Sequence, residues 1–215
     1  MNVGVIGSGT AGRALATAFL SEGHSVMLGT RDTFKEEVQK WRKENAGGKA
    51  GTFEDTAAFG ELLVLVTRGD IASKALEMAG AMNLSGKVII DATNPIAKEP
   101  PVNGVLVYFS SINHSLMEDL QATFGEAKFV KAFNSVGNNL MYKPQMKGGK
   151  PSMFICGNDE GAKKKVTDIL TSFGWETEDM GKAEAARAIE PLCMLWCIPG
   201  MLHNQWSHAF KLLRV

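Results

Sequence analysis

The chain has 215 residues, of which 45% are hydrophobic, and this composition suits one folded domain with an ordinary core. Lys and Arg together number 23, as do Asp and Glu, so the formal net charge at pH 7 is zero. A chain without net charge offers no overall field that attracts nucleic acid or an anionic membrane surface, which excludes both as expected partners. Three cysteines, at positions 156, 193 and 197, lack the spacing of a zinc site or a secreted disulfide framework. We therefore expect a protein of the reducing cytoplasm.

Short apolar runs rich in β-formers alternate with helical patterns through the first two thirds of the chain, which predicts parallel strands joined by crossover helices. The expected strands are Asn2–Ile6, Ser25–Gly29, Leu62–Thr67, Lys87–Asp91, Phe129–Asn134, Met153–Gly157 and Glu176–Asp179. The expected helices are Gly12–Glu22, Phe34–Asn45, Ile71–Met82, Ser115–Phe124 and Glu160–Phe173. The segments Ala46–Gly51 and Lys143–Pro151 are expected to be loops. The predicted fold class is α/β, a doubly wound and mostly parallel Rossmann sheet in one domain, residues 1–215.

The C-terminal part, from about residue 183 to residue 215, is expected to be a short helical extension of this domain. Its apolar stretch Pro191–Leu202 is shorter than the roughly 18 to 20 residues that span a bilayer, so we expect no membrane insertion. A buried helix or a subunit contact fits the stretch better. Because Trp196, Trp206 and Phe210 lie in this region, we expect it to form an acceptor pocket, a homodimer contact, or both.

A glycine-rich motif directly follows the first expected strand and opens the first expected helix, which is the context that a dinucleotide-binding fingerprint requires. The expected cofactor-binding residues of this motif are Gly7, Ser8, Gly9, Thr10, Ala11 and Gly12. Gly7 makes the tight turn, Gly9 lets the backbone approach a pyrophosphate, and Gly12 lets the helix pack closely on the strand. Backbone N–H groups at the helix start then face the two phosphates.

The end of the second strand distinguishes NADP from NAD. Rossmann domains that bind NAD place an acidic residue there, about 20 residues beyond the glycines. This chain has Thr30 and Arg31 at that point, a hydroxyl and a guanidinium suited to a 2′-phosphate. Lys35 either adds a second positive charge or is a solvated lysine on the following helix. Asp32 is expected to cap that helix. The pattern predicts NADP(H) as the cofactor.

The loops that follow the next strands are expected to line the nicotinamide and a small-molecule acceptor, because ligands of open α/β sheets bind beyond the carboxyl ends of the strands. The expected residues are Thr67 and Arg68 after the third expected strand, Asn94 and Pro95 after the fourth, and Asn134 and Ser135 for the substrate. Capping of a turn is an equally common role for Asn and Ser.

No catalytic acid or base stands out. His114 lies near the expected pocket in sequence, yet a capped surface turn is the favoured interpretation of its surroundings. His203 and His208 lie five residues apart on the expected terminal helix, a spacing that does not put them on one face as metal ligands. Cys193 and Cys197 share a helix face among apolar neighbours and are expected to be buried thiols. We therefore predict neither a catalytic side chain nor a metal site.

Six segments together resemble a known family along nearly the whole chain. They are GVIGSGTAG, GTRD, DATNP, VKAFNSVG, MFICGND and AFKLLR. The sequence resembles the NADPH-dependent deazaflavin (coenzyme F420) reductases and the NADPH-binding domain of the STEAP-type metalloreductases. The resemblance implies that Thr30, Arg31 and Lys35 receive the 2′-phosphate. It also implies direct hydride transfer to a flavin-like ring stacked on the nicotinamide; whether that ring is a deazaflavin, FMN or FAD, or the acceptor a quinone or small carbonyl, stays open.

Two other functions are compatible with the fingerprint. Pyrroline-carboxylate or β-hydroxyacid reductases share it but build their substrate site from a long helical second domain. Only about 35 residues follow the strand ending at Asp179, below the roughly 50 residues of small domains, which makes a reductase of imino or keto substrates the less favoured alternative. The other alternative is a non-enzymatic NADP sensor that signals through the apolar C-terminal segment.

Overall fold

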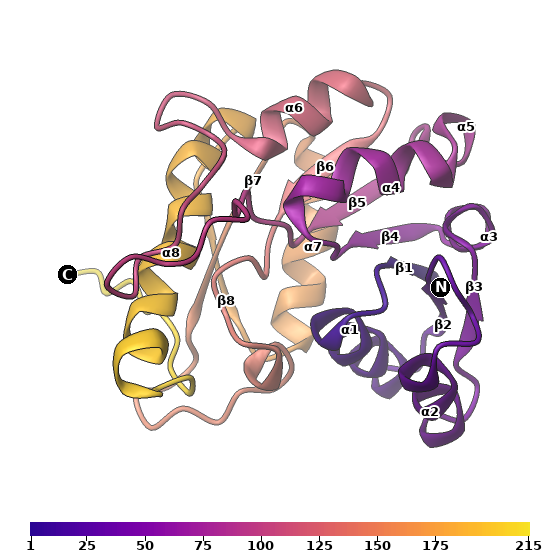
Figure 1. Cartoon of the computed structure of the whole chain (residues 1–215), viewed down its shortest axis with the longest axis horizontal. Coiled ribbons are helices and arrows are strands. Elements are labelled where there is room, and N and C mark those ends of the chain that lie inside the picture. The colour runs from indigo at the N-terminus through magenta and orange to yellow at the C-terminus, as the bar shows by residue number, and fades with distance from the viewer.

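The computed structural model describes residues 1–215, and its strands form one eight-stranded sheet in the order β3-β2-β1-β4-β5-β6-β7-β8 (Figure 1). The strands are β1 (Asn2–Ile6), β2 (Ser25–Gly29), β3 (Lys49–Gly51), β4 (Leu62–Leu65), β5 (Val88–Asp91), β6 (Lys128–Lys131), β7 (Ser152–Gly157) and β8 (Glu176–Asp179). Every neighbouring pair is parallel except β6 and β7, which run antiparallel. The predicted doubly wound, mostly parallel α/β fold is confirmed.

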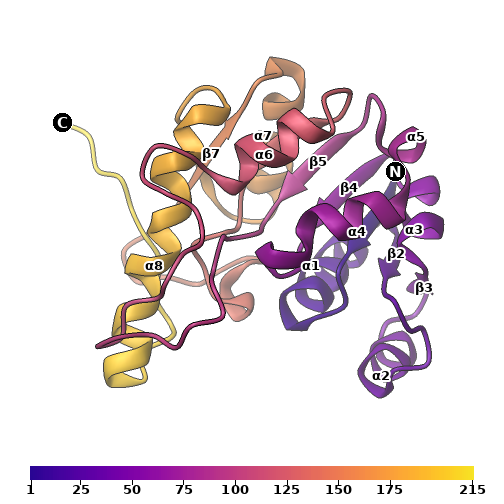
Figure 2. The same cartoon turned by 45° about the horizontal axis from the view of Figure 1, so that its top comes forward.

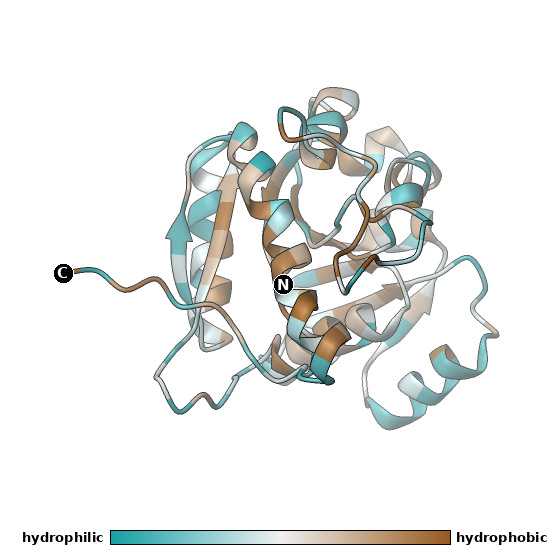
Figure 3. Cartoon of the chain, turned by 60° about the vertical axis from the view of Figure 1, so that its left-hand side comes forward, coloured by the Kyte–Doolittle hydropathy of each residue, from teal (hydrophilic) through white to brown (hydrophobic).

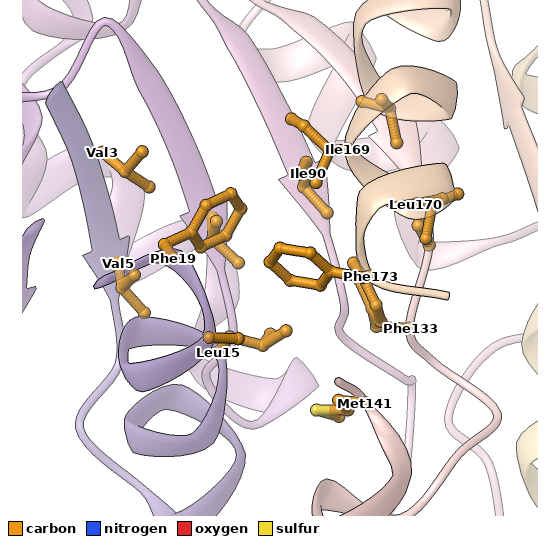
Figure 4. Packing of buried hydrophobic residues seen from close by; sticks show 14 of the residues in the cluster. Val3, Val5, Leu15, Phe19, Ile90, Phe133, Met141, Ile169, Leu170 and Phe173 are labelled. Atoms are coloured by element: carbon orange, nitrogen blue, oxygen red, sulfur yellow. The ribbon is translucent and has the colours of Figure 1, made fainter. Parts of the chain in front are cut away.

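Helices cover both faces of the sheet. They are α1 (Thr10–Ser21), α2 (Glu36–Glu44), α3 (Phe53–Phe59), α4 (Ala72–Ala79), α5 (Ala81–Leu84), α6 (Leu116–Thr123), α7 (Glu160–Ser172) and α8 (Ala186–His203), with 3₁₀ turns η1 (Gly69–Ile71), η2 (Asn138–Leu140) and η3 (Ala183–Ala185). One buried cluster joins α1 and α7 to the sheet, and the other joins α3, α4, α6 and the start of α8. In the first cluster the rings of Phe19 and Phe173 lie 5.0 Å apart (Figure 4). These two layers hold the carboxyl ends of β1 to β6 along one edge.

Three expectations for local structure are wrong. The expected loop Ala46–Gly51 contains the edge strand β3, which pairs only with β2 and is too short to show an alternating pattern. The expected helix Ile71–Met82 is broken at Gly80, whose φ of 86° separates α4 from α5. The expected strand Phe129–Asn134 ends at Lys131, since Phe133 has a φ of 63°. The loop Lys143–Pro151 and the strand Glu176–Asp179 are confirmed.

Helix α8 is longer than its apolar stretch suggested, because Pro191 and Pro199 both lie inside it. The segment Ala183–His203 is long and apolar enough to cross a membrane by length and composition alone, and 39% of its most apolar window is buried in this fold. Arg187 and Glu190 in that segment both form ion pairs within the chain, as befits a helix packed on a folded domain.

The chain beyond α8 is not helical, so the expected place of His208 on the terminal helix is wrong. Residues 204–215 turn back instead, and the backbone N–H of Ser152 on β7 donates to the carbonyl of Phe210 at 2.9 Å. The long connection from β5 to α6, residues 92–115, runs beside α8 (Figures 1 and 2). The Tyr108 hydroxyl in this connection donates to the Glu190 carbonyl at 2.9 Å. The C-terminal half is therefore tied together by contacts between distant segments.

Candidate nucleotide-binding cleft

A cleft of about 560 Å³ lies where the carboxyl ends of β1, β2, β4 and β5 meet. The residues predicted from the sequence that line it are Gly7, Ser8, Gly9, Thr10, Ala11, Thr30, Arg31, Lys35, Thr67, Arg68 and Asn94. The structure adds Phe53, Val66, Gly69, Ile71, Ala92 and Ile96. Phe53 was not expected because its helix α3 was not predicted, although the Thr52 and Asp55 capping box that starts this helix is legible in the sequence.

The three fingerprint glycines differ in what surrounds them. Gly7 has a φ of 130°, and a Cβ there would lie 2.6 Å from the carbonyl oxygen of Val66. A Cβ on Gly12 would lie 1.9 Å from the Gly7 carbonyl oxygen, so this residue serves close packing of α1 on β1 and does not line the cleft. A Cβ on Gly9 would meet no protein atom within 4 Å. The space beside Gly9 is thus left open by the protein, as expected where a ligand approaches the backbone.

Helix α1 begins without a side-chain cap, as do α2, α4, α5 and α8. Its N-cap residue is Gly9, which has no side chain, and its first turn contains no acidic residue. By contrast, α3 and α6 each begin with a complete capping box. The first N–H groups of α1 therefore remain available to an anion, and the helix dipole favours one. The residues present fit a pyrophosphate at this point.

Arg13 supports this loop from behind and was not expected from the sequence. Its Nη1 donates to the carbonyl oxygen of Ser8 at 2.7 Å, and its side chain does not line the cleft. The bond fixes the peptide between Gly7 and Gly9. A single arginine one position after the last glycine is the only signal of this role in the sequence.

The adenosine end of the cleft carries two cationic side chains. Arg31 is exposed and Lys35 is half-buried, and both line the cleft, whereas no carboxylate lines it anywhere. The Thr30 hydroxyl is buried and already engaged, because it accepts from Ser8 Oγ at 3.1 Å and donates to the Asp32 carbonyl at 3.1 Å. Thr30 therefore holds the loop that presents Arg31. An anionic 2′-phosphate would meet cations here and no opposing acid.

Asp32 does not cap helix α2, contrary to expectation. The N-cap residue is Lys35, and α2 begins at Glu36. Asp32 instead accepts a hydrogen bond from the Phe34 N–H at 2.9 Å, which closes a turn that ends before the helix starts. The same side-chain chemistry that suits an N-cap also suits such a turn, so sequence alone did not separate the two roles.

The other end of the cleft is formed by the loops after β4 and β5. The backbones of these loops touch, since a Cβ on Gly69 would lie 2.0 Å from the Asn94 carbonyl oxygen. Asn94 Nδ2 donates to the Asn134 carbonyl at 2.7 Å, and Asn134 Nδ2 donates to the Ile189 carbonyl on α8 at 2.9 Å. Asn134, Ser135 and Pro95 are buried and do not line the cleft. Asn134 is therefore placed behind the wall that Asn94 presents.

The remaining candidates for chemistry lie outside the cleft. His114 is exposed and pairs with Asp119 at 2.6 Å, in a surface turn that precedes α6. Cys193 and Cys197 are buried free thiols, as expected. No group of three or more His, Cys, Asp or Glu side chains is arranged to hold a metal ion. The cleft itself is lined by no His, Cys, Asp or Glu.

A buried ionic cluster lies behind the end of the cleft formed by the loops after β4 and β5, and was not anticipated from the sequence. Lys131, at the end of β6, contacts Asp91 of β5 at 2.7 Å and Glu190 of α8 at 2.9 Å, and all three side chains are buried. Burial alone would lower the pKa of Lys131, but the charges of Asp91 and Glu190 outweigh it and raise this pKa. The signal available in the sequence is a charged residue at the end of each of two apolar strands.

Comparisons with known proteins agree with this cleft. Residues 2–95 match the family described as NADP oxidoreductase, coenzyme F420-dependent. The solved structure of a candidate F420-dependent NADP reductase from Arthrobacter sp. FB24 is 34% identical in sequence, with a TM-score of 0.92 and 99% of both chains covered. The family match includes the glycine cradle and the loop after β2 that carries Arg31 and Lys35.

Two curated relatives extend along most of the chain. The F420-dependent NADP reductase of Methanocaldococcus jannaschii is 26% identical over 205 residues, which cover 91% of this chain and 90% of that protein. Metalloreductase STEAP3 of Rattus norvegicus is 28% identical over 211 residues, or 93% of this chain, but the chain spans only 38% of the length of STEAP3. The chain therefore belongs to the family of coenzyme F420-dependent NADP oxidoreductases.

Proposed function

We propose that this protein transfers a hydride between NADP(H) and a flavin-like acceptor, a deazaflavin or a flavin, stacked on the nicotinamide. The observation that carries the proposal is the composition of one continuous cleft. An uncapped helix start and the open space at Gly9 lie in its middle, and the cations Arg31 and Lys35 lie at one end. Ile96, Asn94 and Ala92 form the other end, and none of these three side chains is an acid or a base.

Each part of the cleft has a separate task in this proposal. When bound, NADPH supplies the hydride from its nicotinamide ring. The first N–H groups of α1 bind the pyrophosphate, while Arg31 and Lys35 bind the 2′-phosphate. The apolar side chains of Ile71 and Ile96, together with Asn94, line the far end and orient the two rings face to face. The protein thus supplies position and electrostatics.

The absence of acid–base groups from the cleft lining favours a ring acceptor over an imino or keto substrate. Reduction of a small carbonyl or imine is assisted by a positioned proton donor, and donors of that kind are His, Tyr, Lys or a carboxylic acid. The only such group in the lining is Lys35, which lies at the adenosine end. A flavin-like ring spreads the incoming charge over several atoms and takes its proton from solvent.

We further propose a cytoplasmic homodimer in which α8 and the connection 92–115 form the contact. Several large apolar side chains are exposed on these two segments, namely Val102, Ile112, Leu195 and Leu202. Figure 3 shows apolar stretches on α8, which comes toward the viewer there, and on the C-terminal tail. An exposed apolar surface of this kind is typical of a subunit contact. Three free thiols are consistent with a reducing compartment.

An NADPH-oxidation assay across acceptor classes tests the function. The acceptors are FMN, FAD, a deazaflavin, a quinone, a ferric chelate and a cyclic imine, each with NADPH and with NADH. We expect turnover with at least one of the three flavin-like rings and a clear preference for NADPH. Turnover with the imine and with none of the rings would replace the proposal by an imine reductase. Tight NADPH binding without turnover of any acceptor would favour the NADP-sensing alternative.

A further inference from the structure

The buried cluster of Asp91, Lys131 and Glu190 carries an unbalanced charge. One ammonium group faces two carboxylates, so the cluster has a net charge of −1 when all three groups are ionised. Cys156 lies beside it, and burial raises the pKa of this thiol to about 12, which keeps it neutral. No further cationic side chain forms an ion pair with either carboxylate.

The polar neighbours of the two carboxylates direct N–H and O–H groups at their oxygens. Asp91 Oδ1 accepts from the Thr93 N–H at 2.9 Å and from the Thr93 hydroxyl at 2.6 Å. Glu190 accepts from the N–H groups of Leu116 and Met117, both at 3.0 Å, at the start of α6. The backbone N–H groups of Thr93, Leu116 and Met117 can only donate, so each carboxylate faces the positive end of at least one peptide dipole. The N-terminal dipole of α6 offsets part of the negative charge and does not remove it.

The cluster lies directly behind the cleft wall. Lys131 Nζ donates to the Thr93 carbonyl at 3.0 Å, and the residues on both sides of Thr93, Ala92 and Asn94, line the cleft. Arg31 and Lys35 lie at the opposite end of the cleft, and Arg68 pairs with Asp70. The cluster is therefore a buried, unbalanced charge directly behind the end where the nicotinamide is proposed to lie.

We propose that this cluster makes the cleft bind the oxidised nicotinamide in preference to the reduced one. The inference rests on the proposed function for the placement of the ring. Loss of a hydride turns the neutral nicotinamide into a cation, and a buried negative charge nearby stabilises the cation through a medium that screens weakly. The same field stabilises the positive charge that develops while the hydride leaves, which accelerates reduction of the acceptor by NADPH.

Dissociation constants for NADP⁺ and NADPH, measured with the acceptor-free protein by calorimetry, test this inference. Asp91→Asn and Glu190→Gln each remove one negative charge with little change of shape. We expect the ratio of the NADP⁺ to the NADPH dissociation constant to rise by roughly three- to tenfold in each variant. Glu178→Gln is the matched control, because it removes a buried carboxylate from β8 at the far edge of the sheet, and its ratio should equal that of the unmodified protein.

The ratio of the two dissociation constants distinguishes the loss of a negative charge from a general distortion of the cleft. The two nucleotides share every atom outside the nicotinamide ring, so a distorted cleft weakens both and leaves the ratio unchanged. Thermal unfolding of each apo variant identifies one that fails to fold, and either of the two variants suffices for the test. An unchanged ratio in a folded variant that binds both nucleotides overturns the inference and leaves the proposed function standing. Failure of the unmodified protein to bind NADP(H) overturns both.

Discussion

The two ends of the cleft are built in different ways. The phosphate end is formed by segments that are short and contiguous in sequence, residues 7–13 and 30–35, and it acts through backbone N–H groups and exposed cations. The nicotinamide end depends on pairs far apart in sequence, such as Asn134 with Ile189 and Lys131 with Glu190. A local motif is easily recognised, whereas buried polar contacts between distant segments specify the rest of the site.

This difference predicts where substitutions act. A change at the phosphate end should alter nucleotide affinity and leave the fold intact, because the groups there face open space. A change in the buried cluster should lower stability first, because it leaves a charge without its partner in the interior. Substitutions at the two ends, each with a matched control, can therefore separate binding from folding.

Gly9→Val should abolish binding of both NADPH and NADH, with a loss of at least about 1,000-fold in affinity, roughly 4 kcal/mol. A Cβ at position 9 meets no protein atom within 4 Å, so we expect little change in the thermal unfolding midpoint. Gly125→Val is the matched control, since Gly125 also has no neighbour within 4 Å but lies far from the cleft in the turn after α6. Retained nucleotide affinity in Gly9→Val would contradict the assignment of Gly9 to pyrophosphate binding.

Lys131→Ala should lower the free energy of unfolding by about 3 kcal/mol, because two buried carboxylates lose the charge that offsets them. Urea unfolding measures this loss. Lys163→Ala provides the comparison, because Lys163 is also buried but its partners Glu160 and Asp179 are substantially exposed. We expect a loss of about 1 kcal/mol there. Equal losses of unfolding free energy in the two variants would show that the buried cluster contributes no more to stability than the partly exposed ion pairs of Lys163.

Arg31→Ala should weaken NADPH binding by roughly 2 kcal/mol, the contribution of a charge-assisted contact to the 2′-phosphate, and should barely change NADH binding. Titration calorimetry with both nucleotides provides the measurement. Arg42→Ala removes the same charge from the exposed last turn of α2, away from the cleft, and should change neither. A similar loss for NADPH and NADH would show that Arg31 does not read the 2′-phosphate.

The smallest expected effect is on the pH dependence of stability, and it comes from Glu118, which joins α6 to α8 through Arg187. Hydrogen bonds from Arg187, with help from Ser115, lower the pKa of Glu118 from 4.5 to about 2. A folded-state pKa below the unfolded value adds stability above pH 4.5, and this stability is lost as the pH falls from 4.5 toward 2. Because Arg187 is 40% exposed, we expect this contact to contribute about 1 kcal/mol to the free energy of unfolding above pH 4.5.

Urea unfolding of the unmodified protein and of Glu118→Gln across pH 6 to pH 2 checks this expectation. The difference between the two unfolding free energies should be largest at pH 6 and should shrink steadily below pH 4.5. A difference that stays constant over the whole range would mean that the carboxylate charge does not contribute.

The mostly parallel α/β sheet and the glycine cradle were predictable because each depends on a local sequence pattern. Gly7 and Gly9 follow the apolar strand β1, and Arg31 follows β2, so position in the sequence determines place in the cleft. The same reasoning did not recover β3, which consists of three residues and owes its existence to β2. It also assigned Asp32 to a helix cap, because an Asx turn and an N-cap use the same side chain.

The nicotinamide end was less predictable for a physical reason. Asn134 was expected to contact substrate, yet its amide bonds to Asn94 and to the Ile189 carbonyl behind the wall. Glu190 lies within an apolar helical segment, where the sequence reveals neither Lys131 nor the α6 amides that bond to its carboxylate. Such partners become visible only when the sheet order brings β5, β6 and α8 together.

The reversal of direction between β6 and β7 puts the loops after the last two strands at the edge of the sheet opposite the cleft. Because β7 and β8 run against the other six strands, the turns that follow them, at Asn158 and at Gly181, open on the side opposite the nucleotide. A Cβ on Gly181 would meet no protein atom within 4 Å, so the surroundings of that turn are open. A dye, an affinity handle or a surface tether fixed at that turn would leave the nucleotide's route in and out unobstructed.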